Sequence, residues 1–257
     1  MAGAQPRSPR GSARRGLTPM TIPYRPAAVA GLLALVLMIG AAAAGVSPAR
    51  AQEGALHPIK GEDGKPVLNY KVPVELESRI EELAGVVVVG NPKGDVTIAE
   101  FYDLNCPFCR RASADIAAMI EADRELRVVL VPFPVLGVAS IQAARVELAV
   151  IKLATPAQVM AFHRKVYAGR GTIDGKRALA AAKDVGLPIA KVTAAADEDS
   201  ITDTMLSHVR LGDALGLQAT PSYIVKGVAV LGHPGRKALE GIVAAIRRCD
   251  APSCDGK

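Results

Sequence analysis

The chain has no tryptophan, and its other aromatic residues are only 5 Tyr and 4 Phe. Half of its residues are apolar, so we expect a core built mainly from Ala, Val, Leu and Ile. The glycine-containing segments 90–94 and 169–171 do not match a phosphate-binding loop. The four histidines are scattered along the chain, which predicts no metal cluster: His57, His163, His208 and His233.

An excess of basic residues is confined to the first 51 positions. The whole chain has a formal charge of +6. Six arginines and no acidic residue lie in residues 1–51, and removing these six from the 31 basic residues leaves 25, equal to the acidic total. The remainder is therefore neutral and lacks the concentrated positive charge of a nucleic-acid-binding protein. We expect no nucleic acid partner.

Residues 1–51 have the pattern of a signal peptide. Basic residues precede an apolar run over 27–46, and Ala49-Arg50-Ala51 matches the small-x-small pattern before a cleavage site at Gln52. Met20 is a possible start, with Arg25 then supplying the basic charge. An uncleaved membrane anchor is the alternative, because about 20 apolar residues can span a bilayer. The sequence thus predicts export to the periplasm.

After cleavage, about 206 residues would remain, enough for one domain with an insertion. Pro, Gly and charge predict a flexible tether over 52–73, and apolar residues at helical spacing predict a short helix over 74–84. Successive strand, helix and strand patterns over 85–137 predict a βαβ unit. An Ala-rich helical insertion over 138–216 and a second ββα half over 217–248 follow. A tail over 249–257 ends the chain.

Cys106 and Cys109 lie between a buried strand and a helix, in the order Cys-Pro-Phe-Cys. The positive end of a helix dipole stabilises a thiolate, and thiol pKa values of about 3.5–7.5 are typical of such sites. Pro107 fits the first turn, where its missing N–H costs little. Cys106 is therefore predicted to attack and Cys109 to resolve, with their disulfide as the redox group and no further cofactor.

A second cysteine pair, Cys249 and Cys254, lies near the C-terminus with Pro252 between the two. All four cysteines are in the part predicted to be exported, where disulfides persist. We expect a local structural disulfide, which would hold the tail. Two alternatives remain: a second redox relay, and a zinc or copper site that combines both pairs.

Two segments resemble the DsbA-like family of thioredoxin-fold proteins. They read Glu100-Phe-Tyr-Asp-Leu-Asn-Cys-Pro-Phe-Cys109 and, after the helical insertion, Gln218-Ala-Thr-Pro-Ser-Tyr223. The resemblance covers about residues 86–248 and implies a thioredoxin-like α/β fold interrupted by a helical domain. It also implies that Pro221 is a cis-proline facing the cysteines and that Thr220, Pro221, Pro107 and Phe108 contact substrate. Glu100 matches a buried acid, which could relay the proton of Cys109.

The sequence departs from strongly oxidising family members at Phe108, where they have His. Without that positive charge, we expect a milder oxidant. The resemblance implies that newly exported, cysteine-containing proteins are oxidised and that a membrane-bound DsbB-like oxidase restores the disulfide. Thr before the cis-proline also occurs in the isomerase branch, so an isomerase or reductase kept reduced by a DsbD-like membrane reductant is one alternative. A non-enzymatic copper- or zinc-binding assembly factor is the other.

Overall fold

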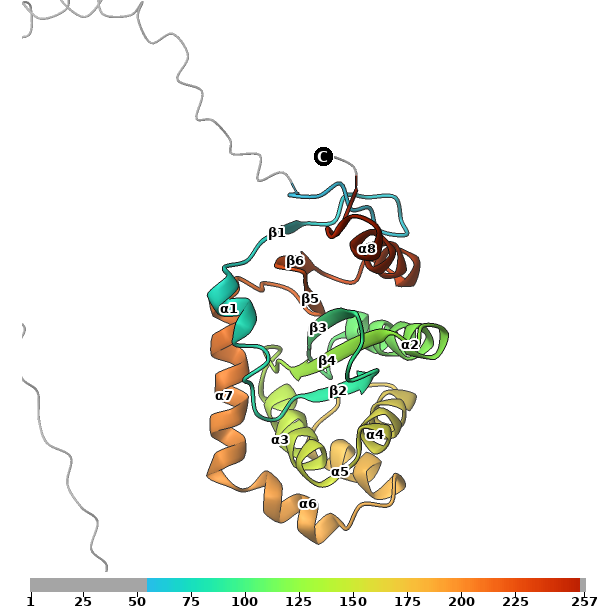
Figure 1. Ribbon diagram of the computed structural model, residues 1–257. Coiled ribbons are helices and arrows are strands. Elements are labelled where there is room, and N and C mark those ends of the chain that lie inside the picture. The colour runs from blue at the N-terminus through green and yellow to red at the C-terminus, as the bar shows by residue number, and fades with distance from the viewer. Residues whose placement is uncertain (1–54, 255–257) are drawn as a thin grey trace, which may run out of the picture. The chain divides into compact units, whose positions relative to one another are not determined.

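The computed structural model describes residues 55–254 (Figure 1). Its centre is one six-stranded sheet with the strand order β1-β6-β5-β3-β4-β2. The strands are β1 (Asn69–Lys71), β2 (Val87–Gly90), β3 (Val96–Tyr102), β4 (Leu126–Pro132), β5 (Ser222–Val225) and β6 (Val228–Leu231). β3 and β4 are parallel and are connected by α2 (Pro107–Ala122), whereas the other neighbours are antiparallel. The predicted mixed α/β fold with its βαβ unit is confirmed.

Helices cover both faces of the sheet (Figure 1). α2 and α8 (Arg236–Cys249) lie on the face of Ile98, where side chains alternate along β3. α1 (Val74–Ser78) and α7 (Asp199–Ala214) lie on the opposite face, where Phe101 packs edge-on against Phe133. Both cores consist mainly of Val, Ile, Leu and Ala, in accordance with the scarcity of aromatic residues.

The inserted helices follow one another between the two halves of the sheet: α3 (Val138–Leu153), α4 (Pro156–Ala168), α5 (Gly175–Asp184), α6 (Ile189–Ala196) and α7. Side chains define where two of them begin. The Thr155 hydroxyl accepts from the Gln158 N–H at α4, and Asp174 accepts from the Arg177 N–H at α5. Both caps lie at breaks visible in the sequence.

The N-terminal segment differs from the flexible tether predicted over 52–73. Of that range, 55–73 is described, and it packs along the sheet edge because β1 pairs with β6. The buried Asn69 side chain accepts from the His57 N–H and donates to the His57 carbonyl oxygen. It therefore holds the main chain at His57, twelve residues earlier in the sequence, against β1. Ile59 and Val72 are also buried. These isolated anchors carry no periodicity, so the composition alone did not indicate them.

The helix predicted over 74–84 ends early, at Ser78, and irregular turns follow. Its apolar residues nevertheless pack inward: Ile80 is buried in the core of the Phe101 face, and Leu76 and Leu83 pack against it. The predicted leader, 1–51, lies outside the described residues. Within 55–254, none of the helices has both the length and the apolar character needed to cross a bilayer.

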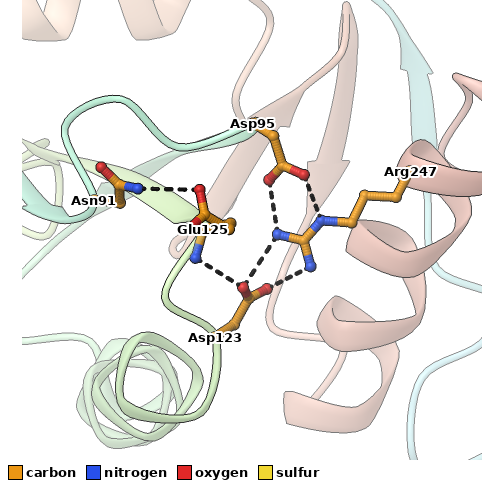
Figure 2. A network of polar contacts seen from close by, with 5 residues as sticks. All are labelled: Asn91, Asp95, Asp123, Glu125 and Arg247. Atoms are coloured by element: carbon orange, nitrogen blue, oxygen red, sulfur yellow. Dashed lines mark hydrogen bonds and ion pairs between the residues drawn. The ribbon is translucent and has the colours of Figure 1, made fainter.

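Arg247 connects three parts of the fold at the end of the sheet where β3 begins (Figure 2). Its guanidinium donates two hydrogen bonds to Asp95, before β3, at 2.8 and 2.7 Å. It donates two more to Asp123, after α2, at 2.7 and 3.1 Å. The pKa values of both carboxyl groups are lowered, chiefly by these hydrogen bonds. Bidentate pairing of this kind is stronger than a single surface ion pair.

Replacing Arg247 with Ala is expected to lower the free energy of unfolding by about 1 kcal/mol, because the paired groups are partly exposed and screened. For a chain of this size that corresponds to a melting temperature about 2–4 °C lower. Since the folded-state pKa values of Asp95 and Asp123 are depressed, the stabilisation is present above their unfolded value of about 3.9 and lost as the pH falls through the folded values. Thermal unfolding at neutral and acidic pH measures this difference.

The neighbouring exposed Arg248 provides the matched control for this helix turn, as Arg248→Ala. An equal loss of stability in both variants, or a loss in Arg247→Ala that persists at acidic pH, would contradict a role for the ion pairs.

Candidate active site

The chain turns sharply between β3 and α2, and the buried Asp103 side chain holds that turn. One carboxylate oxygen accepts from the Asn105 N–H and the Ser140 hydroxyl, at 2.8 and 2.7 Å. The other accepts from the N–H groups of Val135 and Leu136, each at 2.9 Å. Sequence reasoning did not single out Asp103, although Asp in a turn commonly accepts from the N–H two residues further on, as it does here from Asn105.

Asn105 joins this turn to the inserted helical domain. Its amide donates to the Ile173 carbonyl oxygen and accepts from the Ile173 N–H, both at 2.8 Å. Ile173 is fully buried just before α5. The insertion is therefore attached directly to the residue that precedes Cys106.

Cys106 occupies the N-cap of α2, with Pro107 in the first turn. As a thiol it donates to the Thr220 carbonyl oxygen at 3.0 Å. The pKa of Cys106 is lowered to about 5, chiefly by a hydrogen bond from the Cys109 thiol. Partial burial opposes this shift, whereas the Thr220 side chain and the N–H groups of Cys109 and Phe108 add to it. Donors to the sulfur thus favour the thiolate without a positively charged neighbour.

Cys109 lies one helical turn further along α2 and is only 1% exposed. Burial raises the pKa of Cys109 well above its usual range, and the Cys106 hydrogen bond and the Glu100 charge contribute in the same direction. The Asp103 N–H donates to its sulfur at 3.5 Å. The two thiols therefore differ strongly: one is stabilised as a thiolate and the other as a thiol.

Glu100 lies on β3 and is buried beneath the cysteines. Burial, together with the nearby Cys106 thiolate, raises the pKa of Glu100 to about 8. Glu100 and Cys109 line the same small cavity. The structure thus places Glu100, the predicted buried acid, close to Cys109, the predicted resolving cysteine. Glu100 is protonated at neutral pH.

Thr220 and Pro221 directly precede β5 and are joined by a cis peptide bond. The Thr220 carbonyl contact places this loop against Cys106. Pro107 and Phe108, which follow Cys106 directly, are exposed, and the Arg111 guanidinium lies 5.0 Å from the centre of the Phe108 ring. All residues predicted from the two motifs therefore surround Cys106, although 114 positions separate Cys106 from Thr220.

Cys249 and Cys254 form a disulfide, with an S–S distance of 2.07 Å. It follows α8 at the Arg247 end of the molecule, where β3 begins, whereas Cys106 follows the end of β3. At about 3.3 Å per residue, the seven residues of β3 alone span about 20 Å. Direct exchange between the two pairs and a shared four-thiolate metal site are therefore incompatible with this fold.

Three histidines that the sequence left without a role are buried in polar networks. Nε2 of His163 lies 2.6 Å from Glu147, which also accepts from the Tyr102 hydroxyl. His233 lies 2.8 Å from both Tyr223 and Asp115, and His208 lies between two main-chain carbonyl oxygens. Among residues 55–254, no group of three or more His, Cys, Asp or Glu is arranged to hold a metal ion.

The thioredoxin family model matches residues 83–245. A thioredoxin-like oxidoreductase from Silicibacter pomeroyi DSS-3 is 31% identical, with a TM-score of 0.62 over 67% of this chain and 98% of its own. The thiol-disulfide exchange protein alpha-DsbA2 from Wolbachia pipientis is 23% identical, with a TM-score of 0.61 over 67% and 92%. BdbD from Bacillus subtilis is 19% identical, with a TM-score of 0.56 over 72% and 98%. No curated protein sequence matches the chain.

The family match covers more than half of the chain, which therefore belongs to the thioredoxin family. Its fold is that of the DsbA-like thiol–disulfide oxidoreductases, as the sequence resemblance predicted. The family match and these structural neighbours also confirm the expected enzyme class, a protein thiol–disulfide oxidoreductase.

Replacing Thr220 with Val is expected to raise the pKa of Cys106 by about one unit, because a hydrogen bond to a charged group contributes about 1.5–3 kcal/mol. Cys109→Ala removes the largest contribution and should raise the pKa further. Ultraviolet absorbance of the thiolate, followed against pH in the reduced protein, gives the midpoint directly. An unchanged midpoint in both variants would contradict the hydrogen-bond origin of the shift.

Proposed function

We propose that this protein is exported and introduces disulfide bonds into newly exported, cysteine-containing proteins. The observation that carries the proposal is the contrast between the two thiols. Cys106 is stabilised as a thiolate beside the Thr220–Pro221 loop, and Cys109 is buried as a thiol beside Glu100. A pair of this kind accepts two electrons readily, because its reduced form is favoured.

The reaction begins with the oxidised pair. A client thiolate attacks Sγ of Cys106, which forms a mixed disulfide and breaks the Cys106–Cys109 bond; Cys109 leaves and takes up a proton. A second client thiolate then attacks the client sulfur of the mixed disulfide and releases Cys106 as a thiolate. The client has lost two electrons and gained a disulfide, and the pair has gained those electrons. No cofactor other than the Cys106–Cys109 disulfide takes part.

Pro107, Phe108, Thr220 and Pro221 would hold the client chain during exchange. Phe108 is 50% exposed, so an apolar client side chain can cover its ring. The Thr220 carbonyl oxygen accepts from the Cys106 thiol, so the Thr220–Pro221 loop also borders the reactive sulfur. A client segment between them would present its own sulfur to Cys106.

Electron flow towards this protein requires re-oxidation, for which we propose a membrane-bound DsbB-like oxidase. The absence of His at position 108 would make the protein a milder oxidant. Hydrogen bonds to Cys106 nevertheless lower its pKa to about 5, which still favours the reduced form. The signal pattern of residues 1–51 supports export to the periplasm, with cleavage before Gln52.

A disulfide isomerase or reductase, kept reduced by a DsbD-like partner, is the second candidate. Thr220 before the cis-proline favours it. Isomerases are usually oligomeric, so an apolar helix over 74–84 that could hold copies of the chain together would favour this candidate. In the structure α1 has only five residues, and Ile80 packs into the chain's own core. Among the large apolar side chains of that segment only Val74 is mostly exposed, so it offers no continuous apolar face, which favours the oxidase.

The variant Cys109→Ala is expected to accumulate mixed disulfides with exported proteins, which form when the Cys106 thiolate attacks a client disulfide and displaces one of its sulfurs. They persist because the intramolecular attack by Cys109 that would release Cys106 is lost. Non-reducing electrophoresis of acid-quenched cells, followed by mass spectrometry of the captured partners, detects these adducts. The matched control is Cys106→Ser, which retains the Cys109 thiol but lacks the attacking sulfur. Absence of adducts in Cys109→Ala, or equal adducts in Cys106→Ser, would contradict the proposal.

A further inference from the structure

The hydroxyl group of Tyr167, on α4, is buried without a hydrogen-bond partner among residues 55–254. The residue is only 8% exposed. Leaving a buried hydroxyl unpaired is costly, because the desolvation of the group is not compensated, so native proteins normally provide a partner or an ordered water. Tyr167 is the only residue of the described chain with such an orphaned side-chain atom.

Tyr167 borders a small enclosed space that reaches the reactive centre. Its lining includes polar groups from three elements: Glu100 and Tyr102 on β3, Cys109 and Ser113 on α2, and His163 and Tyr167 on α4. About 10 Å³ is open to the centre of a water-sized sphere, which corresponds to about one water molecule. A space of this size with several polar neighbours suits one water, whereas dry cavities are apolar.

Arg110 fixes Tyr167 relative to the cysteines. Arg110 follows Cys109 on α2, and its guanidinium donates to the carbonyl oxygens of Tyr167 and Gly169, at 2.6 and 2.7 Å. It also lies 5.6 Å from the centre of the Tyr167 ring. The end of α4 is thus held against the start of α2, so the position of the hydroxyl is set by the same helix that carries Cys109.

We propose that Tyr167 binds one buried water between Glu100 and Cys109 and acts as a positioning residue for proton transfer between them. This inference rests on the thiol–disulfide exchange proposed above and names a residue of the inserted domain that contributes to it. Tyr167 donates its hydroxyl proton to the water or accepts from it, and stays neutral throughout.

The proton transfer balances within the exchange step. When a client thiolate attacks Cys106, the bond to Cys109 breaks and leaves a thiolate on Cys109. The water donates a proton to that sulfur and accepts one from the Glu100 carboxyl, which becomes a carboxylate. When the pair is re-oxidised, Cys109 returns the proton along the same route. Glu100 then exchanges no proton with bulk solvent during this step.

The direction of transfer agrees with the electrostatics of the site. Burial raises the pKa of Glu100 to about 8, so it is protonated at neutral pH, and it raises the pKa of Cys109 still further. A proton therefore moves favourably from Glu100 to the Cys109 thiolate. The other titratable groups around the cavity are Tyr102, Glu147, His163, Tyr223, Cys106 and Asp103.

Tyr167→Phe tests the inference, because it removes the hydroxyl and keeps the ring. The measurement is the rate at which dithiothreitol reduces the oxidised full-length protein, normalised to the thiolate form of dithiothreitol and followed against pH. In the wild type this rate should fall as the pH rises through the pKa of Glu100, since the proton donor is lost. In Tyr167→Phe we expect a rate about tenfold lower and a flattened pH profile.

Glu100→Gln supplies the second arm of a double-mutant cycle. If Tyr167 acts through the water on Glu100, the double variant should be no slower than Glu100→Gln alone. Tyr70→Phe is the matched control: its hydroxyl donates to main-chain carbonyl oxygens of Leu215 and Gly216. Tyr70 packs in the core of the Phe101 face, whereas Cys106 and Cys109 pack in that of the Ile98 face, so loss of this hydroxyl should leave the rate unchanged. The Cys106 pKa should also be unchanged in Tyr167→Phe.

Additive effects in the cycle, or a wild-type rate and pH profile in Tyr167→Phe, would overturn the inference. A high-resolution crystal structure of the wild type gives an independent result: a water within hydrogen-bond distance of the Tyr167 hydroxyl and Glu100 supports it, and a dry cavity overturns it. Failure of the wild-type protein to exchange with any dithiol would instead refute the proposed function.

Discussion

The burial of Cys109 and Glu100 beneath the start of α2 is the constraint on which the chemistry depends. Cys109 and Cys106 are one helical turn apart, yet burial holds one as a thiol while hydrogen-bond donors stabilise the other as a thiolate. The asymmetry needs no charged neighbour: the largest contribution to the Cys106 shift comes from the Cys109 thiol itself. The Cys109 thiol therefore stabilises the Cys106 thiolate, and in the proposed exchange it also takes up the proton.

The inserted helical domain takes part in forming this site. Asn105 pairs with the main chain of Ile173, and Arg110 binds the carbonyl oxygens that end α4. These contacts flank Cys106 and Cys109 on both sides in sequence. On the side of the insertion these contacts use only main-chain atoms, which are present whatever the side chain. The attachment of the inserted domain therefore depends mainly on Asn105 and Arg110 of the thioredoxin-fold half. The position of Tyr167 beside the buried pair follows from it.

The sequence predicted the elements that carry continuous patterns. β3 and β6 were expected over the residues that form them, because each is a mostly apolar run rich in β-branched residues. The residues around Cys106 were found because two motifs, distant in sequence, belong to one family. Neither approach found Tyr167, His163 or Glu147. Their environment depends on the packing of α3 and α4 against β3, and a lone tyrosine or histidine in a helix carries no signal of its own. The N-terminal segment was missed for a similar reason, since Asn69 anchors it through side-chain contacts.

The redox state of Cys106 and Cys109 in intact cells tests the proposed direction of electron flow most directly. Acid quenching traps the thiols, and alkylation then distinguishes a free pair from a disulfide in the exported protein. A pair that is mostly oxidised is expected of a disulfide donor that a membrane oxidase regenerates. A pair that is mostly reduced would contradict that role and would mean that a reductant maintains it, as an isomerase or reductase requires.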